Sequence, residues 1–242
     1  MSLLPNYTHP TWRNLLTDEF LLRLSTIEAQ LNTFPIKTCG YSYFPEKQNV
    51  MRFLSMNVKE IKCVIIGMEP YPSYYQKGNK ILPVATGRSF EIANVTSWDQ
   101  KFKQSSLRNI LKTVYFNETG EKKSLEEVRK EIKEGKFFIS QPDEWFENLE
   151  KEGVLFLNAT LTVEPGKPNT HTQVWEEVMN EIIDYIEREV KPKWLLFGNK
   201  AEERLLKAIG INGNIYKCHH PRLASFVDEN IFKNIPDIKW NI

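Results

Sequence analysis

The chain has 242 residues, with 32 lysines and arginines against 31 aspartates and glutamates. This length suits a single α/β domain with a large core, and the balanced charge excludes a global positive field, so any nucleic-acid binding must be local. Three cysteines are too few for a four-thiolate cluster. No apolar run reaches about 18 residues, and we expect neither a cleavable signal sequence nor a membrane-spanning segment. We expect a reduced, intracellular protein, cytoplasmic in a bacterium or virus and nuclear in a eukaryote.

The chain begins with a segment that we expect to be helical. Apolar residues at helical spacing predict a helix from Thr11 to Leu31, and Pro45 to Met56 looks like a second helix with proline in its first turn. We therefore predict a single domain over residues 1–242, in which residues 1–58 form a helical N-terminal lead-in.

Four short apolar runs, separated by helix-length segments, follow this lead-in. They are Lys62–Gly67, Gly153–Asn158, Lys193–Gly198 and Ile215–Cys218. Runs that are apolar throughout are typical of strands buried on both faces of a parallel sheet. The pattern predicts a three-layer α/β/α fold around a central, mainly parallel four-stranded sheet.

The segments between the runs predict helices. Residues 117–136 are rich in Glu and Lys and contain a capping-box signature, Ser124 followed by Glu127; we expect an exposed helix with a solvated face, the alternative being a docking surface for a protein partner. Residues 172–190 carry an apolar stripe typical of a helix packed on a sheet. A further helix is expected from Asn199 to Ile209, ended by Gly210.

Polar residues follow the runs, and the carboxyl ends of parallel strands form the ligand-binding edge of such a sheet. Pro70 and Pro72 stiffen the loop that presents Glu69 and Tyr71. A carboxylate there suits a general base or the partner of a developing cation. A capping or salt-bridged glutamate is an equal alternative at this point.

Four further candidates follow, and three of them have a structural alternative. Asn158 closes an apolar strand, where its amide suits reading a heterocycle, although turn formation is the simpler reason for it. Phe90 offers a face for stacking or packs beneath its loop. One of His219 and His220 is expected to face the cleft, and three adjacent ligands with Cys218 cannot surround one metal ion. Arg222 meets phosphate or is solvated.

Taken in order, these residues resemble the motifs of the uracil-DNA glycosylase superfamily, particularly its first family. The matching segments run colinearly from about Cys63 to Ser225, and the first, Gly67-Met68-Glu69-Pro70-Tyr71-Pro72, is similar to the water-activating Gly-Gln-Asp-Pro-Tyr-His motif, with the final proline of the poxvirus members. Next, Gly87-Arg88-Ser89-Phe90 resembles the stacking motif, Ser105-Ser106-Leu107 resembles the phosphate-contacting turn, and Leu155-Phe156-Leu157-Asn158 with Leu161-Thr162-Val163 resembles the Leu-Leu-Leu-Asn strand. Finally, His171 with Trp175 resembles the Ser-His and Gly-Trp-Glu segment, and His220-Pro221-Arg222-Leu223-Ala224-Ser225 resembles the His-Pro-Ser-Pro-Leu-Ser loop.

The resemblance implies a role for each of these positions. Glu69 and His220 would be catalytic, and no metal or other cofactor would be needed. The flipped base would be bound by Met68, Tyr71, Phe90 and Asn158. The DNA backbone would be contacted by Ser106, Arg222 and Ser225, with Leu223 as the candidate intercalating residue, displaced relative to the family's leucine.

The resemblance predicts a monomeric DNA glycosylase that removes uracil, or a related modified pyrimidine, and initiates base excision repair. Glu69 is one methylene longer than the family's aspartate, and a displacement of about 1 Å can cost roughly a hundredfold in rate. A catalytically weakened glycosylase-like DNA-binding or scaffold protein is therefore the second hypothesis. A nucleotide-binding α/β protein unrelated to repair is the third, and no phosphate-binding glycine loop supports it.

Overall fold

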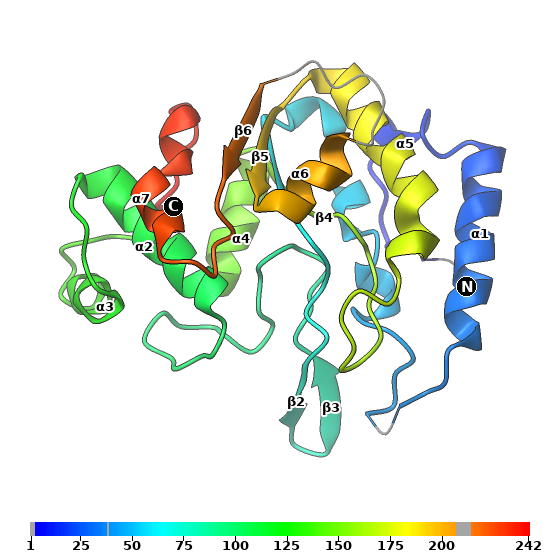
Figure 1. Ribbon diagram of the computed structural model, residues 1–242, viewed down its shortest axis with the longest axis horizontal. Coiled ribbons are helices and arrows are strands. Elements are labelled where there is room, and N and C mark those ends of the chain that lie inside the picture. The colour runs from blue at the N-terminus through cyan, green and yellow to red at the C-terminus, as the bar shows by residue number, and fades with distance from the viewer. Residues whose placement is uncertain (1–2, 38, 207–213) are drawn as a thin grey trace.

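The computed structural model describes residues 3–37, 39–206 and 214–242, and its centre is a four-stranded parallel sheet (Figure 1). The strand order is β4-β1-β5-β6, and all three neighbouring pairs are parallel. The strands are β1 (Cys63–Gly67), β4 (Val154–Asn158), β5 (Lys193–Phe197) and β6 (Ile215–Cys218). This confirms the predicted sheet and its four apolar runs.

Helices cover both faces of the sheet. Side chains alternate in direction along each strand, so the apolar strands present apolar side chains to both faces. Val64 and Ile66 of β1 pack on the side of α1 (Asp18–Thr33) and α5 (Thr172–Val190). Cys63 and Ile65 of the same strand pack on the opposite side, which is covered by α2 (Ser105–Thr119), α4 (Pro142–Lys151), α7 (Ser225–Glu229) and the 3₁₀ helix η5 (Ile231–Asn234). The predicted three-layer α/β/α architecture is confirmed.

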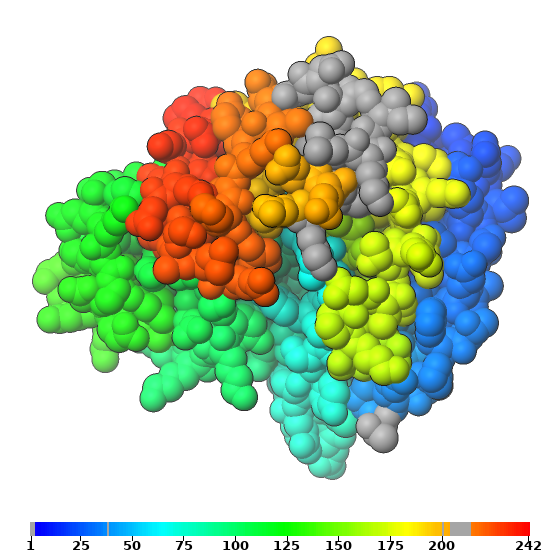
Figure 2. All heavy atoms as spheres, in the orientation of Figure 1, coloured from blue at the N-terminus to red at the C-terminus, as the bar shows by residue number. Residues whose placement is uncertain are grey.

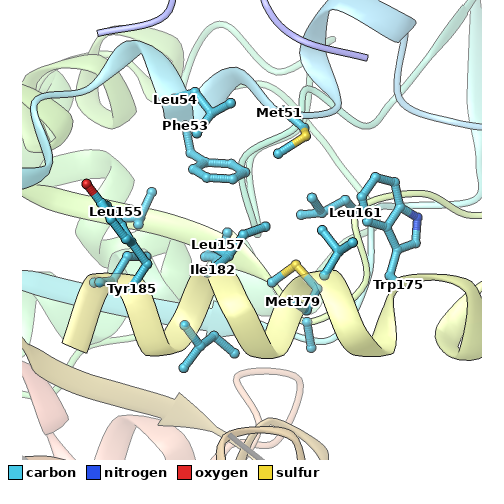
Figure 3. Packing of buried hydrophobic residues seen from close by; sticks show 14 of the residues in the cluster. Met51, Phe53, Leu54, Leu155, Leu157, Leu161, Trp175, Met179, Ile182 and Tyr185 are labelled. Atoms are coloured by element: carbon cyan, nitrogen blue, oxygen red, sulfur yellow. The ribbon is translucent and has the colours of Figure 1, made fainter. Parts of the chain in front are cut away.

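The α5 side of the core also buries the segment before the sheet. Figure 3 shows Met51, Phe53 and Leu54 lying across from Met179 and Ile182 of α5, with side chains of β4 between them. The bounds predicted for α5 are correct.

The N-terminal segment differs from the prediction. The first α-helix begins only at Asp18, capped by the Thr17 hydroxyl, and is preceded by η1 (Pro10–Trp12). No α-helix forms between residues 45 and 56; the segment instead contains η2 (Lys47–Asn49) and η3 (Arg52–Ser55), followed by η4 (Val58–Glu60). Val50, Met51, Phe53 and Leu54 are nevertheless all buried, so tertiary packing overrides the local helical preference here and buries the apolar residues through short 3₁₀ turns.

The charged segment at 117–136 is also shorter as a helix than expected. Residues 117–119 complete α2, which Gly120 ends in a left-handed conformation with φ 75°. The helix α3 (Leu125–Lys133) then begins with the predicted capping box between Ser124 and Glu127. At α6 (Asn199–Leu206), the predicted end at Ile209 and Gly210 lies outside the described residues.

Sequence patterning missed the helices α2, α4 and α7 and an antiparallel hairpin of β2 (Tyr74–Lys77) and β3 (Lys80–Pro83). Within the described part of the chain, no helix is both long enough and apolar enough to cross a bilayer.

Candidate active site

The carboxyl ends of β1 and β4 meet at a very close approach. Gly67 pairs with Asn158, and a Cβ atom at Gly67 would lie 2.7 Å from Ser89 Cβ, 2.8 Å from Asn158 Oδ1 and 3.4 Å from Phe90 Cε2. No other residue type fits without displacing one of these groups. Glycine at this position therefore lets the Asn158 amide and the Phe90 ring close on the same point.

The Phe90 ring lies between two other strand ends. Its centroid is 5.3 Å from that of Phe197, the last residue of β5, and 6.2 Å from that of His220, which follows β6. Phe90 has φ 66°, in the left-handed region that a phenylalanine rarely adopts. The local conformation is therefore imposed by the surrounding structure, which suits a position under functional constraint.

Ion pairs of Arg88 hold the Phe90 loop. The guanidinium binds Glu91 at 2.9 Å and Glu150 of α4 at 2.6 Å, and the Arg88 and Glu91 side chains are almost completely buried. Burial alone would lower the pKa of Arg88, but the hydrogen bonds and charges of Glu150 and Glu91 outweigh it and raise the pKa above its ordinary value. The loop is thus fixed to α4 by a permanently charged group.

Asn158 is 3% exposed. Its backbone position is fixed next to β1, since the following residue, Ala159, donates its N–H to Gly67 O at 2.8 Å. A buried amide normally has hydrogen-bond partners. Here the side chain faces the space at Gly67, with its Oδ1 2.8 Å from where a Cβ of Gly67 would be.

His220 is oriented by its own loop. Its Cβ lies 3.0 Å from where a Cβ of Gly198 would be, and Nδ1 accepts the backbone N–H of Arg222 at 3.1 Å. Burial, together with the Arg222 charge, lowers the pKa of His220 below its ordinary value of 6.5. A neutral ring with an accepting Nδ1 carries its proton on Nε2. His220 is therefore a hydrogen-bond donor at neutral pH.

Glu69 is fixed by a residue that sequence reasoning did not single out. Its Oε2 accepts the backbone N–H of Asn169 at 2.8 Å, and Asn169 has a left-handed φ of 63°. An asparagine tolerates that conformation better than most residues, and this was the only signal in the sequence. Tyr71, two residues after Glu69, packs into the core, and burial raises the pKa of its hydroxyl.

A cleft of about 590 Å³ opens beside these groups. Its lining includes Met68, Asn169, Phe197, Gly198, His220, Arg222 and Leu223. Phe90 and Asn158 do not line this cleft and are nearly buried; Phe90 adjoins its lining residues Phe197 and His220, and Asn158 adjoins Gly67, the residue before Met68. Glu69 is joined to it through Asn169. The structure thus places the predicted residues at one edge of the sheet, in two tiers. The deeper tier surrounds Gly67, Phe90 and Asn158, and the outer tier, with Arg222 and Leu223, lines the cleft.

The residues predicted to contact a backbone lie around this edge. Ser106 is in the first turn of α2 and nearly buried, and Ser225 is the first residue of α7. Arg222 and Leu223 are exposed. The loop that carries them is tied to α2 by Asn109, whose Nδ2 donates to Pro221 O at 2.7 Å.

Both adjacent histidines line the cleft; His219 also lies against Glu229, and His220 against Phe90. No group of three or more histidines, cysteines, aspartates or glutamates in the described residues is arranged to hold a metal ion.

Comparison with known proteins now bears on this geometry. The family model described as the uracil DNA glycosylase superfamily matches residues 55–237. The chain belongs to the uracil-DNA glycosylase superfamily. A uracil-DNA glycosylase of Mesomycoplasma hyopneumoniae is 28% identical over 221 residues, covering 84% of this chain and 85% of the relative. One from Buchnera aphidicola is 31% identical over 181 residues, covering 74% and 68%.

Solved structures agree in fold. The crystal structure of wild-type UNG from Nitratifractor salsuginis superposes with a TM-score of 0.75 at 20% identity, covering 97% of this chain and 93% of that one. The mimivirus uracil-DNA glycosylase superposes with a TM-score of 0.64 at 18% identity, covering 90% and 70%. The superfamily fold therefore extends over almost the whole chain.

The segment that resembles the superfamily's Ser-His and Gly-Trp-Glu motif forms a buried network behind the site. Trp175 donates its indole N–H to Thr162 Oγ1 at 2.6 Å, and Thr162 Oγ1 lies 2.9 Å from His171 Nδ1. His171 is completely buried, and this burial lowers its pKa to about 4. A neutral His171 thus helps to join the start of α5 to the loop after β4.

Proposed function

We propose that this protein is a DNA glycosylase that hydrolyses the N-glycosidic bond of uracil, or of a related modified pyrimidine, flipped out of DNA, and so initiates base excision repair. The observation that carries the proposal is the approach of an amide, an aromatic ring and a neutral imidazole around Gly67 and Phe90. Membership of the superfamily supports it.

Base recognition is assigned to the deeper tier. A base cannot be cut from its sugar inside a stacked duplex, so it must enter a pocket. Phe90 would stack on it and Asn158 would pair with its donor and acceptor edge. Tyr71, on the loop after β1, would crowd C5 and exclude the methyl group of thymine, while Met68 would contact the base from the cleft wall.

His220 would stabilise the leaving group. Breaking the bond leaves negative charge on the base, and a donor aimed at its oxygen strengthens as that charge grows. The proton on Nε2, inferred from the Arg222 contact at Nδ1, supplies such a donor without charging the ring. Activity should therefore fall on acidification only below pH 6.5, where the ordinary histidine value lies and this pKa is lowered further.

Glu69 would act on the sugar. The transition state resembles an oxocarbenium ion, and a carboxylate stabilises that cation and orients the attacking water. Water then adds to the sugar carbon as the bond to the base breaks; the water gives up a proton to the Glu69 carboxylate, and the base leaves as an anion. The Asn169 N–H limits where the longer side chain can lie, which supports a productive position despite the extra methylene.

DNA is the proposed macromolecular partner. Ser106, Ser225 and Arg222 would contact phosphates, and exposed Leu223 would enter the space left by the flipped nucleotide. A monomer, and a docking role for residues 117–136, stay predictions.

The proposal is tested by uracil release from a single-stranded oligonucleotide without added metal. We expect Asn158→Ala and His220→Ala each to lower the rate of release by on the order of a hundredfold or more, with binding to the same strand changed far less. His9→Ala, which removes a histidine far along the chain from the site, is the matched control and should keep full activity.

One observation favours a second candidate, a DNA-binding module with weakened hydrolysis: the motif position holds Glu69 rather than aspartate. Wild-type protein that retains uracil-containing DNA on a gel yet leaves it intact would establish this alternative. Glu69→Asp separates the two further. If the methylene limits the rate, shortening the side chain raises turnover; a large loss would refute that explanation.

A further inference from the structure

The hairpin β2–β3 projects from the site-bearing edge of the sheet and has no role in the chemistry above. Figures 1 and 2 show it extending beyond the rest of the molecule. It starts at Tyr74, just after the loop that carries Glu69, and ends at Pro83, just before the loop that carries Phe90. Both of its attachments are therefore segments of the candidate active site.

The tip of the hairpin carries two like charges. Lys77 lies directly opposite Lys80 in the antiparallel register, joined through Gly78, whose φ of 60° suits a tight hairpin turn. Like charges directly opposite one another destabilise a strand pair. Both lysines are exposed, and neither forms an ion pair with any residue that the structure describes. Residues 73–83 contain no acidic side chain.

The base of the hairpin is held firmly. Ile81 packs against the buried cluster of Phe44 and Val163, and Val84 N donates to Ser73 O at 3.0 Å. The tip lysines are therefore presented on an anchored support. A local repulsion kept on a rigid element next to a site is typical of a functional feature.

We propose that the Lys77–Lys80 tip binds the phosphodiester backbone of the DNA strand that contains the flipped nucleotide. This inference rests on the proposed function and adds a contact to it that the superfamily motifs do not include. An anionic phosphate beside the two ammonium groups relieves their mutual repulsion, and such contacts position a strand without reading its sequence. The competing explanation is that the lysines only prevent edge-to-edge pairing of an exposed two-stranded sheet.

The test compares the double variant Lys77→Gln/Lys80→Gln with Lys133→Gln/Lys239→Gln. The control pair removes the same net charge from exposed lysines of α3 and the C-terminal segment, away from the hairpin. Binding of a uracil-free single-stranded oligonucleotide is measured by fluorescence anisotropy over a series of salt concentrations. Each lost phosphate contact changes the slope of log affinity against log salt by about 0.7, so the hairpin variant should have a slope shallower by about 1.4.

The control should keep the wild-type slope. A hairpin variant with unchanged slope and affinity, whether or not it self-associates in light scattering, overturns the proposal; self-association would then identify the lysines as protection of the sheet edge. Equal reductions of the salt slope in the hairpin variant and in the control would also overturn the proposal, because net charge alone would explain them.

Uracil release separates this inference from the proposed function. With a substrate strand, the hairpin variant should show a raised KM and an unchanged kcat, since the tip contacts neither the base nor the reacting sugar. Wild-type protein that releases no uracil defeats the proposed function, while the salt slopes still decide the hairpin contact.

Discussion

The two tiers of the candidate site differ in how they are held. The deeper tier around Gly67, Phe90 and Asn158 is buried, and ion pairs and close packing define it. The outer tier, with Arg222 and Leu223, is exposed. Under the proposed function, base selection would depend on rigid packing, whereas Arg222 and Leu223 would contact DNA as solvated side chains. Substitutions should therefore affect folding and chemistry in the first tier, and mainly affinity in the second.

The largest effect on stability is expected at Arg88. Arg88→Met leaves the buried carboxylate of Glu91 without its main partner, and breaking a buried pair in this way costs about 3–5 kcal/mol of unfolding free energy. Urea denaturation measures it. The double variant Arg88→Met/Glu91→Leu should recover much of the loss.

The matched control is the ion pair of Lys123 with Glu131, in the partly exposed cluster at α3. Lys123→Met should lower the unfolding free energy far less than Arg88→Met does, because solvent screens this pair. Equal losses at Arg88 and Lys123 would contradict the distinction between a buried and a solvated ion pair.

The next effect concerns His171 and pH. Because burial lowers its pKa to about 4 from an ordinary value of 6.5, the unfolded chain takes up the proton first as pH falls. The stability of the neutral buried ring is fully present above pH 6.5 and is lost between pH 6.5 and 4, by up to about 3 kcal/mol.

Thermal unfolding at a series of pH values tests this, with His171→Gln as the comparison. The variant should lose less stability than wild type as pH falls from 6.5 to 4.5. Carboxylates whose pKa values lie below 4.5 in the folded state, such as Glu131 and Glu164, titrate at lower pH in both proteins. If both proteins lost the same stability between pH 6.5 and 4.5, His171 would not be the group responsible for the pH dependence.

Gly67→Ala tests the deeper tier by activity. The new methyl group would lie within 2.8 Å of Asn158 Oδ1, and a displacement of the amide by about 1 Å should lower uracil release roughly a hundredfold. The unfolding free energy should fall by about 1–3 kcal/mol from overpacking. Full activity in the alanine variant would remove Asn158 from base recognition.

The smallest effect is expected in the outer tier. Arg222→Gln should change stability by less than about 0.5 kcal/mol, as for other exposed positions. Its charge helps to lower the pKa of His220, so the acid limb of the pH–rate profile should move to higher pH in the variant. An unmoved limb would mean that burial alone sets the pKa of His220.

Patterning predicted the regular elements well where one physical rule dominates. Strands buried on both faces must be apolar throughout, so their four runs and the stripe of α5 were visible in the sequence. Residues 45–56 were predicted wrongly, because proline and apolar spacing suggest an α-helix, whereas tertiary packing overrides this local preference and buries Val50, Met51, Phe53 and Leu54 through short 3₁₀ turns. The hairpin was missed since half of it is solvated and its alternation is weak.

The sequence alone determined which chemical groups stand at the strand ends, because strand period and turn residues are local properties of the chain. Only the tertiary structure decided that Phe90, from a loop, and His220, from beyond β6, lie against one another, and that Asn169 holds Glu69. Contacts between distant segments depend on how the layers pack and on where a missing Cβ, as at Gly67, allows side chains from a strand end and a loop to meet.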